Sequence, residues 1–85
     1  MEWYERNKVL QSFFDAMQKR NLELLNDDKK WIRKVTKNMP AEELRNILIG
    51  YAKKWQEGIK TEPCDIKKQN SGRKRANLYL LSLAD

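Results

Sequence analysis

The strongest constraint on the fold is a helical repeat of apolar residues that runs through most of the chain. Its cleanest stretch lies within residues 44–59, where apolar side chains recur at intervals of three and four without a break. No segment shows sustained alternation of period two, the pattern of a half-buried strand. The stripe consists of Leu44, Ile47, Leu48, Tyr51, Ala52, Trp55 and Ile59. We therefore expect an all-α protein with this segment at the centre of its core.

The same spacing, with the residues that begin and end helices, predicts four helices. They are expected over residues 2–25, 28–38, 40–57 and 71–83. The first carries a repeat of seven through Trp3, Leu10, Met17 and Leu24, with Phe13 and Phe14 widening the stripe. Gly58 is placed to end the third helix in a left-handed conformation, and Asn70 or Ser71 is placed to cap the fourth. At 85 residues, the expected architecture is one domain over 1–85, a compact bundle of about four helices.

The net charge of +6 is concentrated in two segments. Residues 27–39 contain five bases and two acids, residues 59–85 contain six bases and three acids, and the rest of the chain balances to zero. In the predicted second helix, an apolar arc of Trp31, Ile32, Val35 and Met39 lies opposite the bases. Those bases are Lys29, Lys30, Arg33, Lys34 and Lys37. Such a distribution favours a basic surface that faces an acidic partner.

Catalysis is poorly supported by the residue types present. The chain has no histidine, the commonest general base and metal ligand, and Cys64 is its single cysteine. The adjacent carboxylates at 27–28 and 42–43 stand where helices begin, so capping explains them. We expect no enzyme activity, no cofactor and no metal site. The lone cysteine, the acidic and aromatic opening of the chain, and the absence of a long apolar run predict a cytoplasmic protein with no membrane partner.

The most specific local feature is the segment 69–77, where three consecutive bases stand at the expected start of a helix. Bases there are unfavourable for the helix itself, since its first turn is already electropositive. An anion at that end would receive free N–H groups and basic side chains together. The predicted phosphate contacts are Lys67, Lys68, Ser71, Arg73, Lys74 and Arg75, with Asn77 as a base-edge contact and Lys30, Arg33, Lys34 and Lys37 as a flank. Sequence leaves open whether the two basic segments form one patch.

A protein interface is the alternative. Leu78 and Leu81 broaden the last apolar stripe beyond one face, so this helix either sits deep or offers a second apolar surface. Trp3 and Tyr4 are adjacent and cannot both face inward, which leaves Tyr4 as an exposed aromatic. An adaptor or inhibitor that binds an acidic surface of a host protein, or a homodimer, would use these side chains.

The tail from Asn70 to Leu80 resembles the C-terminal segments of short uncharacterised proteins of proteobacterial prophages and mobile elements. This resemblance implies a small accessory protein that acts on nucleic acid or on the machinery that handles it. The prediction is a helical accessory or regulatory protein that binds DNA or RNA through the basic start of its last helix. The alternative is a mobile-element adaptor or inhibitor that binds a host protein, for instance a nucleic-acid-handling enzyme.

Overall fold

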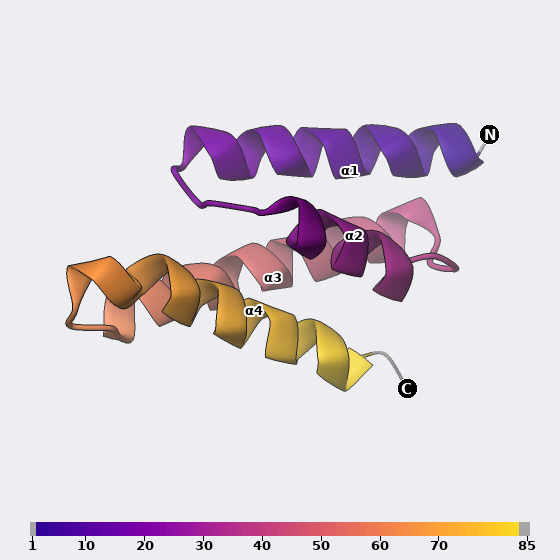
Figure 1. Cartoon of the computed structure of the whole chain (residues 1–85). Coiled ribbons are helices and arrows are strands. Elements are labelled where there is room, and N and C mark those ends of the chain that lie inside the picture. Colours follow the sequence, from indigo (N-terminus) through magenta and orange to yellow (C-terminus); the bar gives the residue numbers. More distant parts are fainter. Residues whose placement is uncertain (1, 84–85) are drawn as a thin grey trace.

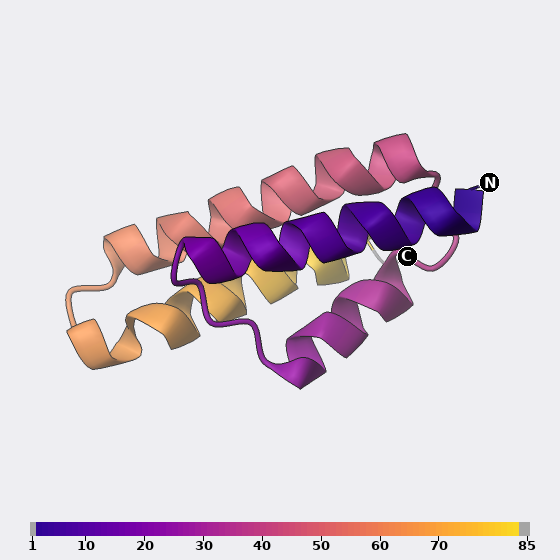
Figure 2. The same ribbon diagram turned by 90° about the horizontal axis from the view of Figure 1, so that it is seen from above.

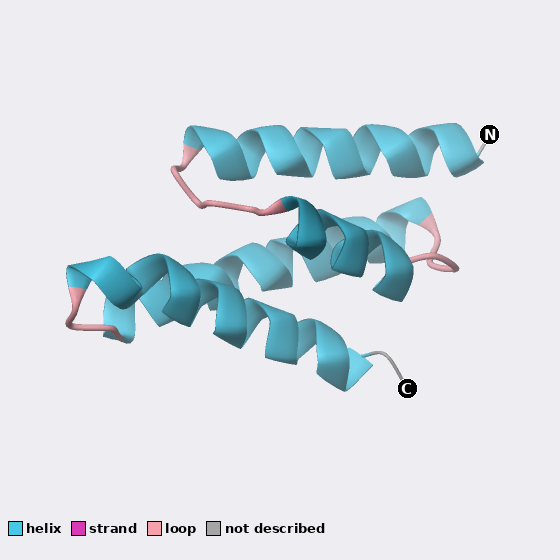
Figure 3. Ribbon diagram, viewed as in Figure 1, coloured by secondary structure: helices cyan, strands magenta, loops and turns pink. Residues whose placement is uncertain are grey.

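The protein is all-α, as predicted. The computed structural model describes the backbone of residues 2–83 and the side chains of residues 4–83, so Trp3 of the predicted stripe lies outside the described side chains. The helices are α1 (Glu2–Lys19), α2 (Asn26–Val35), α3 (Ala41–Thr61) and α4 (Lys68–Leu83), with the short 3-10 turn η1 (Asp65–Lys67) before α4 (Figures 1 and 3). Over the described range, no helix is both long enough and apolar enough to span a bilayer.

The four helices run in two directions. Figures 1 and 2 show α1 and α3 running the same way, while α2 and α4 return in the opposite direction. The most extensive packing joins α3 to α4, which form a helical hairpin, and α1 lies along α3. The core is built from the predicted stripe of α3, with Leu44, Tyr51 and Trp55 completely buried.

The first helix ends six residues earlier than predicted. Asn21 adopts a left-handed conformation with φ of 58°, and the N–H of Leu22 donates to the carbonyl of Met17 at 2.9 Å. The N–H of Asn21 donates to the carbonyl of Gln18 at 3.0 Å, which completes a Schellman motif. Leu22 and Met17 are both buried, so the motif carries its usual hydrophobic contact.

Other predicted helix boundaries are also wrong. α2 begins at Asn26 instead of residue 28, because Asp28 accepts the N–H of Leu25 from within the first turn, and it ends at Val35 instead of residue 38. Gly58 does not end α3: the helix continues to Thr61, and no glycine of residues 2–83 has a positive φ. A Cβ at Gly58 would lie 2.6 Å from the Cα of Gly72, so this glycine is needed for the close approach of α3 and α4. Asn70 and Ser71 do not cap α4, because the helix already begins at Lys68. The three bases at 73–75 therefore lie beyond its first turn.

Candidate nucleic-acid interface

Arg73, the first of the three consecutive bases at 73–75, is turned into the protein. Its Nε donates to Oδ2 of Asp28 at 2.8 Å, in an ion pair whose side chains are only 17% and 6% exposed. One terminal nitrogen donates to the side chain of Asn70 and the other to the carbonyl of Glu23. The guanidinium also stacks on the ring of Trp55, 5.2 Å from its centroid. All three guanidinium nitrogens are thus engaged, and Arg73 holds α4 to α2.

Asn77, the predicted base-edge contact, belongs to the same internal network. Its amide nitrogen donates to Oδ1 of Asp28 at 3.1 Å, and its amide oxygen accepts from the hydroxyl of Tyr51 at 2.9 Å. Asp28 also accepts the backbone N–H of Leu25 at 3.0 Å. This buried carboxylate therefore has three donors, and sequence reasoning missed it because it treated Asp28 only as a cap.

Burial raises the pKa of the Tyr51 hydroxyl well above its ordinary value, and the charge of Asp28 raises it further. In the unfolded chain the phenol loses its proton near pH 10, whereas the folded protein retains it, so stability falls as pH rises above about 10. The free energy of unfolding of Tyr51→Phe should fall less steeply with pH, as measured by urea unfolding between about pH 8 and pH 11. Parallel curves for the two proteins would contradict this role for Tyr51.

Other residues of α4 that were predicted to bind phosphate contact acidic side chains instead. Ser71 donates to Glu62 at 2.8 Å, Lys68 lies 3.6 Å from Asp65, and Arg75 lies 3.3 Å from Glu57. The hydrogen bond from Ser71 is the main cause that lowers the pKa of Glu62, followed by the N–H of Cys64, so this acid stays charged beside the segment. We call residues 67–75 the α4 segment. Its exposed bases without an ion pair to a described residue are Lys67 and Lys74. The α4 segment is therefore a weaker anion site than the sequence predicts.

The bases of α2 are arranged differently. Four of them are exposed and form no ion pair with any described residue. We call this set the α2 basic face: Lys30, Arg33, Lys34 and Lys37. Its opposite side is fixed by Ile32 and Thr36, both completely buried, and by Asp28. The fifth base, Lys29, is half-buried, with its amine 5.4 Å from the ring centroid of Phe14.

The two basic segments are separated by acidic and polar groups. The junction of α2 and α4 is occupied by Asp28, Arg73 and Asn77. Asp28 faces α4, and the four bases of the α2 basic face lie about 140–240° around the helix from it. The guanidinium of Arg33 lies 5.1 Å from the ring centroid of Phe14 on α1. The charge of α2 is therefore directed away from the α4 segment.

The predicted protein-interface residues are exposed. Tyr4, Leu78 and Leu81 are 60%, 56% and 53% exposed, so the outer side of α4 offers an apolar surface instead of sitting deep in the core. No group of three or more potential metal ligands occurs within residues 2–83.

No protein-family model, no curated protein and no solved structure matches this chain. The resemblance of its tail to prophage proteins thus stays a prediction.

Proposed function

We propose that this protein is a nucleic-acid-binding accessory protein that contacts phosphates through the α2 basic face. The observation that carries the proposal is that these four bases are exposed on one short stretch and form no ion pair within the described part of the chain, whereas the bases of α4 are largely engaged. Unpaired bases on a rigid face bind an anionic polymer without first breaking internal contacts.

The spacing of the α2 basic face suits a phosphate backbone. Lys30 and Lys37 are seven residues apart, which is about 10 Å along a helix axis. One strand of duplex DNA presents about three phosphates over that length. Three of its four bases are lysines, which bind phosphate as point charges, so we propose binding that depends little on sequence.

Changing Lys30, Arg33, Lys34 and Lys37 together to Gln should abolish most of this binding. If four phosphates of duplex DNA are contacted, the wild-type affinity falls with a log–log salt slope of about −3.6, or about 150-fold between 50 and 200 mM salt. The variant should lose both the affinity and most of the slope. Gel-shift or tryptophan-fluorescence titrations with duplex DNA, single-stranded DNA and RNA across a salt series measure both quantities and identify the polymer.

A matched control removes the same charge elsewhere. The control changes four exposed lysines outside α2 to Gln: Lys19, Lys60, Lys67 and Lys74. It should retain the wild-type slope to within about one unit. Equal losses in the two variants would show that net charge alone drives binding, and a loss confined to the control would move the interface to the α4 segment.

The second candidate function is an adaptor or inhibitor that binds a host protein. The exposure of Leu78 and Leu81 on the outer side of α4 favours it, because nucleic-acid binding has no use for these side chains. Binding of this kind depends less on salt than phosphate contacts do. It should be lost in a Leu78→Ser, Leu81→Ser variant that leaves nucleic-acid binding unchanged.

A further inference from the structure

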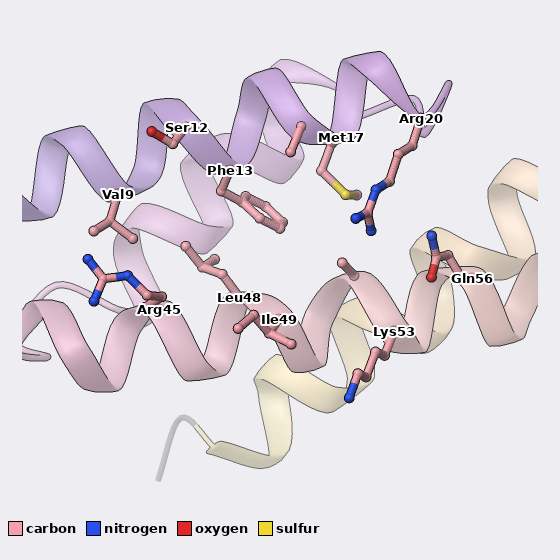
Figure 4. A pocket seen from close by; sticks show the side chains of 12 residues that line it. Val9, Ser12, Phe13, Met17, Arg20, Arg45, Leu48, Ile49, Lys53 and Gln56 are labelled. Carbon is pink, nitrogen blue, oxygen red and sulfur yellow. The ribbon is translucent and has the colours of Figure 1, made fainter.

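An apolar groove lies between α1 and α3 on the side of α1 away from α2 (Figure 4). It encloses about 420 Å³. The charged groups of Lys29 and Arg33 of α2 lie over the aromatic ring of Phe14 on α1. Ser12 and Ala16, which border the groove, lie two residues from Phe14 and so about 160° around the helix from it. The groove and the α2 basic face are therefore separate surfaces.

The floor of the groove is apolar and its rim is basic. Small side chains on both helices leave it open, and Ile49 is 51% exposed despite its size. Three of the twelve lining residues are bases and none is an acid. The bases are Arg20, Arg45 and Lys53. A ligand that covers Ile49 is stabilised by the burial of apolar surface, and a ligand that carries negative charge is also attracted by the basic side chains of the rim.

The bases are spread along the length of the groove. Arg45 lies near Val9 at one end, and Arg20 lies near Gln56 at the other (Figure 4). Positions 45 and 56 are eleven residues apart on α3, which corresponds to about 16 Å or three helical turns. The groove thus has the length of a short helix, with positive charge at both ends and in between.

We propose that this groove docks an acidic amphipathic helix of a partner protein. Apolar residues spaced three and four apart on one face of that helix would cover Ile49 and fill the floor, as in other helix-in-groove complexes. Carboxylates flanking the apolar stripe would face Arg20, Arg45 and Lys53.

The distribution of charge disfavours other occupants. A fatty acid has one carboxylate and would leave two of the three separated bases without a partner. A second copy of this chain, docked about a two-fold axis through the groove, would bring the same bases against one another. A helix with several carboxylates matches the whole rim.

Fluorescence anisotropy with synthetic peptides tests the proposal. The probe is a labelled peptide of about four turns, with leucines in one stripe flanked by glutamates. The control peptide has the same composition in an order that breaks the stripe. We expect saturable binding of the first peptide only. Ile49→Ser should weaken it by about tenfold or more, and so should the double reversal Arg45→Glu, Lys53→Glu.

Two variants provide the matched controls. Leu78→Ser removes an equally exposed apolar side chain from α4, and the quadruple α2 variant removes charge from the other surface; both should bind the probe as the wild type does. All variants should give the wild-type circular dichroism spectrum, because the altered side chains are exposed. The proposal is overturned if the two peptides bind alike, if the groove variants bind as well as the wild type, or if decanoate binds the groove and neither peptide does.

Discussion

Asp28→Ala is expected to lower the free energy of unfolding by about 3–5 kcal/mol, because it leaves the largely buried charge of Arg73 without its partner. It also removes the acceptor of the Asn77 amide and of the Leu25 N–H. A domain of 85 residues has a total stability of only about 4–13 kcal/mol, so the loss is a large part of the whole. Urea unfolding followed by circular dichroism measures it.

Exposed ion pairs of Glu57 on α3 are the control. Glu57→Ala breaks its contacts with Arg75 of α4 and with Lys54. All three side chains are more than 40% exposed, so the change should cost less than about 1 kcal/mol. The double variant Asp28→Ala, Arg73→Met should be more stable than Asp28→Ala alone, because it no longer buries an unpaired charge. Equal and small losses for Asp28→Ala and Glu57→Ala would contradict a structural role for this network.

Gly58→Ala is expected to destabilise the protein by about 2 kcal/mol, although alanine favours a helix over glycine by up to about 1 kcal/mol. The added Cβ would lie 2.6 Å from both the Cα of Gly72 and the carbonyl oxygen of Ser71. These are backbone atoms, so no side-chain rotation relieves the contact and the hairpin of α3 and α4 must open. A bulkier Gly58→Leu should lose still more, by the same measurement.

Gly50→Ala is the matched control on the same helix. The nearest atoms to its added Cβ belong to the end of the Tyr79 side chain, which can turn aside. We expect a change of less than about 1 kcal/mol in either direction. Similar losses at positions 50 and 58 would show that helix contact at Gly58 is not the reason for that glycine.

The fold class could be predicted from sequence because the apolar spacing of α3 is unbroken. The helix ends were harder. Asn21 follows Lys19 and Arg20, and asparagine tolerates the left-handed conformation of a helix end, so a Schellman motif was readable there. This signal was overlooked because Leu24 continues the repeat of seven of α1 in the sequence. The role of Gly58 was predicted wrongly because the reason for a glycine there is the close approach of Gly72, which is 14 residues away in the sequence.

The candidate site was harder to predict because exposure depends on tertiary partners. A run of bases such as 73–75 looks the same in sequence whether its members face solvent or a buried acid. Arg73 pairs with Asp28, which is 45 residues away, and no local sequence pattern predicts that contact. The α2 bases could be grouped from helical periodicity alone, because their opposite face is apolar. The groove between α1 and α3 requires knowing which helices are neighbours.

The most direct test of the proposed function is a titration of isotope-labelled protein with short duplex DNA, single-stranded DNA and RNA, followed through the backbone amide resonances. If the α2 basic face contacts phosphates, the largest shifts occur across residues 29–37 for at least one polymer and shrink as salt is raised, while residues 48–56 along the groove change little. Shifts centred on residues 67–75, or no salt-sensitive shifts with any of the three polymers, would contradict it.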